Sequence, residues 1–208
     1  MNSAHPEQVR PIPNNNLTSN ADLMAKAREI LKGKWGFGVL VTFLYILISA
    51  IPSSAKGIGG LIGLIINGPI ALGLAILFLS LVRTRNAKID QMFEGFSRFG
   101  VAFVAYLLMV LFIMLWALLL IVPGIIAALG YSMTFFIIAD NPDIKASDAL
   151  AKSKQMMMGN KKKLFYLGCR FIGWFLLCIL SAGIGFLWLM PYGYTSAALF
   201  YEDLKQQQ

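Results

Sequence analysis

The chain has 208 residues, of which 58% are hydrophobic and 13% are charged, and its formal net charge is +8. Soluble domains carry about 25% charged residues, so this composition excludes an ordinary soluble domain and indicates lipid as the solvent. A basic charge is also found in nucleic-acid-binding proteins, and the positions of the basic residues must decide between the two interpretations.

The N-terminal segment is polar and contains several Pro and Asn residues. It has no apolar core of the kind that a signal peptide needs. Residues 1–18 are therefore predicted to be a disordered cytoplasmic tail, and residues 19–208 to be a single polytopic membrane domain. The only histidine, His5, lies in the tail, which argues against a histidine-based metal site.

Six apolar runs follow, each near the roughly 20 residues that a helix needs to cross a bilayer. Two of them abut at Pro123–Gly124, a dipeptide that favours the end of one helix and a turn into the next. The fold class is thus predicted as an all-α membrane protein with six transmembrane helices in three hairpins. The predicted spans are residues 35–55, 61–82, 100–122, 123–139, 164–181 and 184–201.

A short amphipathic stretch ending near a glycine precedes each predicted hairpin, at Gly33, Gly95 and Gly159. These glycines are separated by 62 and 64 residues, a spacing that indicates an internal repeat. Chance similarity between apolar segments is the alternative interpretation.

The first and third hairpins match further when Pro69 is aligned with Pro191. The alignment pairs Arg83 with Lys205 near the ends of the two helices. It also pairs small residues at a spacing that lets helix backbones approach closely in lipid.

The first and third amphipathic stretches are expected to form helices on the membrane surface. The first is expected to start at Ser19 or Asn20, and the third to be capped by Ser147. One side of the first is expected to carry Ala21, Met24, Ala25, Arg28 and Leu31. One face of the third is expected to carry Ala146, Ala149, Leu150, Ser153, Met156 and Met157. Interfacial lipid contact is predicted for Lys152, Lys161, Lys162, Lys163, Met156 and Met157.

Basic residues concentrate in alternate connections between the spans. Sixteen of the eighteen Lys and Arg residues lie in residues 1–34, 83–99 and 140–163 or at the C-terminus, and the other connections hold only Lys56. The positive-inside rule then predicts cytoplasmic N- and C-termini, in the inner membrane of a bacterium.

Other functional classes find little support in the sequence. Residues 140–163 contain no aromatic residue, whereas binding of single-stranded nucleic acid uses aromatic side chains beside basic ones. A carboxylate metal site at Asp140, Asp143 and Asp148 is a weak alternative, because its spacing matches no calcium loop. Catalytic motifs are absent, so neither an enzyme nor a cofactor is predicted.

A few polar residues are candidates for an intramembrane polar or ligand contact: Arg170, Asn67, Glu202 and Asp203. Arg170 lies inside a predicted span, where it can snorkel to the surface, pair with Glu202 or Asp203, or contact a substrate. Asn67 precedes Gly68–Pro69, which predicts either a kink or a transporter-like break in the helix.

The third hairpin carries a family resemblance. The stretches "MMMGNKKKLF", "FIGWFLL", "GIGFLWLMPY" and "ALFYEDLK", with "VPGIIAALGYSMTFFIIADNP" and "AREILKGKW", resemble the bacterial integral membrane family called domain of unknown function 975. The resemblance covers about residues 22–205. It also extends distantly to the membrane domain of glycerophosphodiester phosphodiesterases, which implies a lipid-associated role without their catalytic residues.

The function expected from the sequence is that of a non-enzymatic multi-pass inner-membrane protein that binds lipid or a membrane partner protein. A small transporter or channel subunit is the alternative, and it would need a polar cavity at mid-membrane. The expected partners are membrane lipids, with a second copy of the chain or another membrane protein as further candidates, and no nucleic acid.

Overall fold

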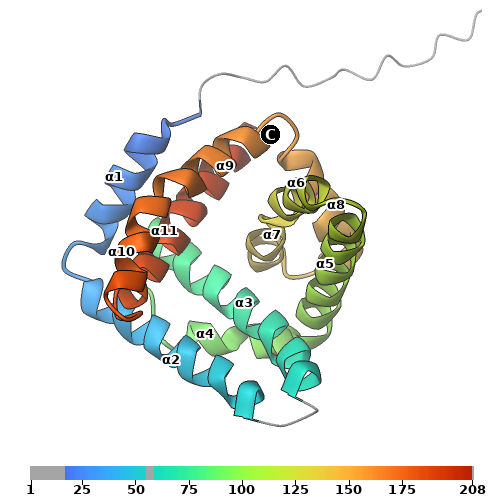
Figure 1. The fold of residues 1–208 in the computed structure, drawn as a ribbon, viewed down its shortest axis with the longest axis horizontal. Coiled ribbons are helices and arrows are strands. Elements are labelled where there is room, and N and C mark those ends of the chain that lie inside the picture. Colours follow the sequence, from blue (N-terminus) through green and yellow to red (C-terminus); the bar gives the residue numbers. More distant parts are fainter. Residues whose placement is uncertain (1–16, 55–58, 208) are drawn as a thin grey trace, which may run out of the picture.

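The computed structural model describes residues 17–54 and 59–207, and these residues form only helices and their connections (Figure 1). In chain order the helices are α1 (Asn20–Leu31), α2 (Trp35–Ser54), α3 (Gly59–Thr84), α4 (Gln91–Glu94), the 3-10 helix η1 (Gly95–Arg98), α5 (Phe99–Leu119), α6 (Ile121–Tyr131), α7 (Thr134–Asp140), α8 (Ala146–Met156), α9 (Lys161–Arg170), α10 (Ile172–Leu180) and α11 (Phe186–Lys205). The all-helical fold class is thus confirmed for the described residues. The tail predicted over residues 1–18 lies outside them, apart from Leu17 and Thr18.

Helix α3 is the most enclosed of the long apolar helices, and it crosses the middle of the view in Figure 1. It packs against α2, α4, α5, α7 and α11. Its most apolar window is 56% buried inside the protein, and Leu72, Leu77 and Phe78 are enclosed almost completely. Pro69 lies inside α3 without ending it, so the Asn67–Pro69 segment is helical, and the transporter-like break, one of the two alternatives, does not occur.

Two other long apolar segments bury little of their surface. The windows of α4–α5 and of α9–α10 are each only 11% buried. Leu118 and Leu180, at the ends of α5 and α10, are 86% and 81% exposed. Large apolar surfaces of this kind mark contact with lipid or with another protein.

Four helical segments of the described chain are long and apolar enough to cross a membrane: Ile62–Thr84, Gln91–Leu119, Ile121–Asp140 and Lys161–Leu180. A fifth is added if α1 and α2, which meet at a bend of 96°, form one broken span. The membrane-compatible character predicted from composition is therefore confirmed. The number of six spans stays a prediction.

The turn between the two abutting apolar runs lies earlier than predicted. Helix α5 ends at Leu119, the extended residue Leu120 makes the turn, and Pro123 lies in the first turn of α6. Proline is tolerated in a first helical turn because its missing N–H would have no partner there. Gly124 matters for packing, since a Cβ at this position would lie 2.8 Å from the Cβ of Ala117.

Helices α1 and α8, which were predicted to lie on the membrane surface, begin in different ways. Ser19 caps α1 by accepting a hydrogen bond from the backbone N–H of Asp22, as predicted. The predicted cap of α8 is wrong, because this helix begins at Ala146 after the extended residue Lys145. Ser147 thus lies inside the first turn, and its hydroxyl donates to the Asp148 side chain.

The apolar face of α8 is the predicted one, but protein covers it. Its buried residues are Ala146, Ala149, Leu150, Ser153 and Met156. Helix α8 packs against α5, α6 and α7. The face of α1 is rotated from the prediction, since Leu23, Ala27 and Ile30 are buried whereas Ala21 and Ala25 are exposed.

The three glycines that suggested a repeat fall into two groups. Gly33 and Gly159 follow α1 and α8 with φ of +80° and +79°, a conformation that favours glycine. Gly95 has φ of −59° and serves a different purpose, because a Cβ there would collide with the backbone of Pro69 and Gly73 in α3. The first and third units therefore resemble each other more closely than either resembles the second.

Candidate functional site: an ion cluster, a hollow and an arginine pocket

The ends of α3, α7 and α11 meet in an ion cluster. The Arg83 guanidinium lies 2.8 Å from one carboxylate oxygen of Asp140, and the Lys205 ammonium lies 2.5 Å from the other. Arg83 also contacts the Glu202 carboxylate at 2.6 Å. The Tyr201 hydroxyl donates to Asp140 over 3.1 Å, so this carboxylate has three partners from two helices.

The sequence explains why cations gather at this point. Arg83 and Lys205 lie in the last turns of α3 and α11, where the helix dipole favours positive charge. Asp140 is the last residue of α7, where its own charge is unfavourable without a cation. Its side chain is only 10% exposed, so the two cations replace the water that the carboxylate loses.

The two acidic residues proposed as partners of Arg170 have other partners. Glu202 binds Arg83. Asp203 accepts hydrogen bonds from the backbone N–H and the hydroxyl of Thr18, at 2.9 and 2.8 Å. The pairing of Arg170 with Glu202 or Asp203 is therefore wrong, and Thr18 belongs to the folded domain and not to the tail.

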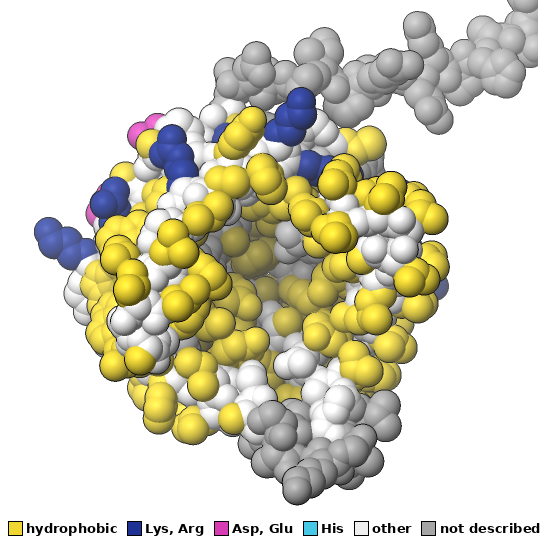
Figure 2. All heavy atoms as spheres, viewed as in Figure 1, with side chains coloured by type: hydrophobic (Ala, Val, Ile, Leu, Met, Phe, Trp, Pro, Cys, Tyr) yellow, Lys and Arg dark blue, Asp and Glu magenta, His cyan; other side chains and the backbone are white. Residues whose placement is uncertain are grey.

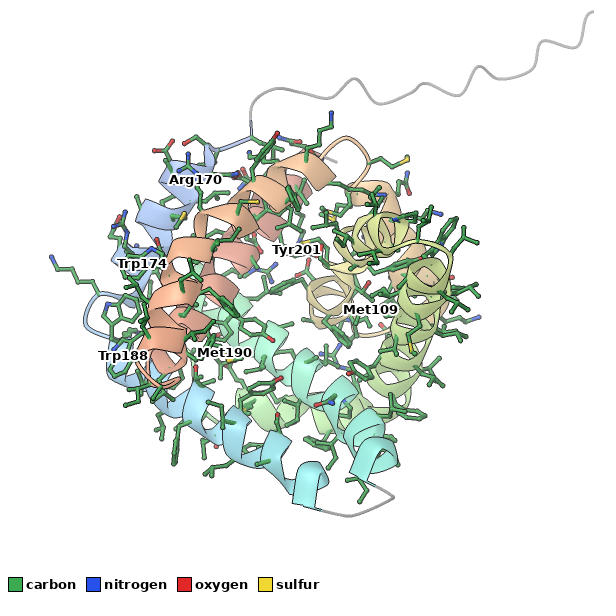
Figure 3. All side chains as sticks on the ribbon, viewed as in Figure 1. Met109, Arg170, Trp174, Trp188, Met190 and Tyr201 are labelled. Atoms are coloured by element: carbon green, nitrogen blue, oxygen red, sulfur yellow. The ribbon has the colours of Figure 1, made fainter. Side chains whose placement is uncertain are left out.

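Arg170 instead lines a pocket of about 320 Å³ between α1, α9–α10 and α11. Trp174 lies one turn further along, and Figure 3 shows both residues beside α1. The buried Tyr192 closes the pocket from α11 and contacts Phe171 at 5.0 Å between ring centroids. The remaining lining residues come from one side of α1: Ala21, Met24 and Arg28.

The predicted lipid contacts divide between exposed lysines and buried methionines. Lys162 is exposed, and Lys152, Lys161 and Lys163 are half-buried. Met156 and Met157 are 5% and 0% exposed, so their predicted contact with lipid is wrong. Their side chains fill the protein core, because α8 turns its apolar face toward α5–α7.

Lys163 differs from the neighbouring lysines. Its ammonium group is buried, has no hydrogen-bond partner among the described residues, and lies 5.9 Å from the centroid of the Phe200 ring. Asn20 donates to the backbone carbonyl of Lys163 over 3.0 Å. These contacts join the start of α9 to α1 and α11.

The remaining predicted candidates form no polar site. Asn67 is half-buried in the continuous helix α3. No group of three or more His, Cys, Asp or Glu side chains in the described chain lies close enough to hold a metal ion. Asp140, one member of the alternative carboxylate site, is occupied by the two cations described above.

Figure 2 shows a hollow in the middle of one face, with hydrophobic side chains over most of its wall. In the same view, Met190 of α11 and Met109 of α5 lie on opposite sides of it, and Tyr201 lies near its middle (Figure 3). The hollow separates α10–α11 from α5–α6. A recess with a mostly hydrophobic wall is suited to hydrocarbon and not to a polar substrate.

Sequence reasoning missed the ion cluster and the position of Arg28 in the same pocket as Arg170. The cluster did leave a signal, since the repeat alignment paired Arg83 with Lys205, and both now bind the same carboxylate. Arg28 left no signal of comparable strength, because an arginine on an amphipathic helix is ordinary.

The described chain is all-helical, exposes large apolar surfaces on α5 and α10, and has four or five segments that are long and apolar enough to cross a membrane. These features are those of the helical membrane protein class. The chain belongs to the family described as a protein of unknown function, DUF975, whose model matches residues 17–129 and 118–208. No curated protein and no solved structure shows significant similarity to it. The family predicted from the sequence is thereby confirmed, and the distant likeness to phosphodiesterase membrane domains stays a prediction.

Proposed function

We propose that this protein is a non-enzymatic lipid-binding protein of the bacterial inner membrane. It crosses the membrane six times in three hairpins, with α1, α4 and α8 on the cytoplasmic side and both termini in the cytoplasm. The hollow between α10–α11 and α5–α6 holds the acyl chains of membrane lipid. The observation that carries the proposal is the hydrophobic wall of this hollow (Figure 2).

The buried hydroxyl groups support lipid binding over transport. A transporter needs polar groups that face a water-accessible cavity. The buried hydroxyls of the apolar helices instead donate to carbonyls three or four residues earlier in the chain. These pairs are Thr42 with Gly38, Thr134 with Tyr131, Thr195 with Pro191 and Ser196 with Tyr192. Their donors are thus already used within the helices.

Native mass spectrometry of the purified protein tests the proposal. Wild-type protein should retain lipid after mild detergent exchange, because hydrocarbon that fills an apolar recess has no favourable replacement in water. The substitutions Met109→Trp and Met190→Trp narrow the hollow and should reduce the retained lipid. Leu118→Trp adds the same bulk at an exposed position and is the matched control.

Equal lipid retention by all three variants and the wild type would exclude the hollow as the lipid site. Absence of retained lipid in the wild type would contradict lipid binding altogether. Circular dichroism must show the same helix content for the wild type and the three variants, so that misfolding does not explain the result.

A further inference from the structure

The pocket beside α1 contains two arginines that form no hydrogen bond or ion pair with the residues that the structure describes. The described chain has five arginines: Arg28, Arg83, Arg85, Arg98 and Arg170. Arg83 binds two carboxylates, Arg85 pairs with Glu29 at 3.3 Å, and Arg98 donates to the carbonyl of Ile138 over 2.7 Å. Arg28 and Arg170 have no such contact, and both line the same pocket.

The acidic side chains of α1 are occupied elsewhere. The Asp22 carboxylate accepts a hydrogen bond from the Ser19 hydroxyl at 2.7 Å, and Glu29 pairs with Arg85. Among the described residues, no acidic side chain lines the pocket. Arg28 and Arg170 are both exposed at this pocket, so an anion that enters it is attracted by two positive charges.

The remaining walls indicate the kind of molecule that carries the anion. Trp174 is 52% exposed on the open side of α10, whereas Tyr192 is buried at the back of the pocket. Arg170 ends α9 at a break within the apolar segment Lys161–Leu180, so apolar surface continues beyond it. Aromatic rings beside basic side chains are typical of the level of lipid headgroups in a membrane.

We propose that Arg28 and Arg170 bind the phosphate of an anionic phospholipid headgroup, with its acyl chains passing over Trp174. Guanidinium groups suit this role because their parallel N–H donors match two phosphate oxygens. This inference rests on the proposed lipid-binding function but concerns a second site, separate from the hollow. The same chemistry fits a free phosphate ion, and the experiment must therefore distinguish the two.

The test compares phosphatidylglycerol with phosphatidylcholine, added to delipidated protein and measured by native mass spectrometry. The wild type should bind the anionic lipid more tightly. The double variant Arg28→Gln/Arg170→Gln should weaken this binding about tenfold, because it removes hydrogen bonds between charged partners. Its binding of phosphatidylcholine should stay unchanged.

Lys88→Gln/Lys154→Gln is the matched control, because it removes the same charge from two exposed side chains. It should bind phosphatidylglycerol nearly as well as the wild type. If it loses as much affinity as the arginine variant, the preference is general electrostatic attraction and the pocket assignment is overturned. The more conservative Arg28→Lys/Arg170→Lys replaces the double variant if that protein does not fold, and an intermediate affinity is then expected.

Two further outcomes separate this inference from the proposed function. Equal binding of both lipids by the wild type overturns the headgroup site and leaves lipid binding in the hollow intact. Inorganic phosphate alone is also added, and the melting temperature is followed. If phosphate stabilises the wild type as much as phosphatidylglycerol does, and the arginine variant is not stabilised, the ligand is a soluble anion and the lipid assignment is overturned.

Discussion

Arg83 and Lys205 bind opposite oxygens of a single carboxylate, that of Asp140. Each of the two cations follows the internal proline of its helix, Pro69 or Pro191, by the same fourteen residues. The related positions of α3 and α11 thus converge on the end of α7. The ion cluster consequently connects three helices that are distant in the sequence.

Asp140→Asn should destabilise the protein by about 1–3 kcal/mol, because it leaves Arg83 and Lys205 beside a neutral amide. The midpoint of thermal unfolding in one detergent measures the effect. Asp143→Asn removes the same charge from an exposed residue and serves as the control. Identical midpoints for the two variants would show that the ion cluster contributes nothing to stability.

Gly95→Ala and Gly100→Ala should change stability in opposite directions. A Cβ at Gly95 collides with the backbone of Pro69 and Gly73, so α4–η1 must move away from α3, at a cost of about 1–3 kcal/mol. A Cβ at Gly100 has no neighbour within 4 Å, and alanine inside a helix gains about 0.5–1 kcal/mol over glycine. Thermal unfolding again gives the comparison, and a neutral Gly95→Ala would contradict the close approach.

Ser153→Ala should cost about 1–3 kcal/mol, because it leaves two buried backbone groups without a partner. The Ser153 hydroxyl donates to the Gly130 carbonyl over 2.8 Å and accepts from the Met133 N–H over 3.2 Å. Ser147→Ala removes a hydroxyl from the exposed side of the same helix and should change stability by under about 0.5 kcal/mol. Equal effects at the two positions would argue against the attachment of α8 to the α6–α7 turn.

Lys152→Cys should react with a membrane-impermeant thiol reagent only after the cytoplasmic side is opened. The prediction follows from the sorting of basic residues between alternate connections. Both native cysteines, Cys169 and Cys178, are free and must first be replaced by alanine. Ile184→Cys, on an exposed residue near the α10–α11 turn, should show the opposite accessibility. Labelling of position 152 in intact cells would show that the proposed orientation is wrong.

Hydrophobic periodicity predicted the helices and the apolar face of α8, but not the surroundings of that face. Ala146, Leu150 and Met156 share one side whichever partner covers them, and an amphipathic pattern does not distinguish lipid from protein. The face of α1 was harder to assign because Ala21 and Ala25 are only weakly apolar. Leu23 and Ile30 determine which side is buried.

The ion cluster and the arginine pocket depend on contacts between residues far apart in the sequence. Arg83 and Asp140 are brought together only when α3 packs against α7. Arg170 was identified as exceptional from its place in an apolar run, yet its neighbour in space, Arg28, lies on another helix. Composition and spacing thus locate unusual charges, whereas tertiary packing decides which of them have partners.

The hydrogen bonds between Thr18 and Asp203 bring the first and last described helices together at their ends. The two ends of the described chain therefore lie beside each other, and only a short distance along the surface separates them from being joined. A short linker from residue 207 to residue 17 would bridge this distance, and new termini could be opened between α3 and α4. Such a circular permutant should fold, since the order of the helices in space does not depend on where the chain begins.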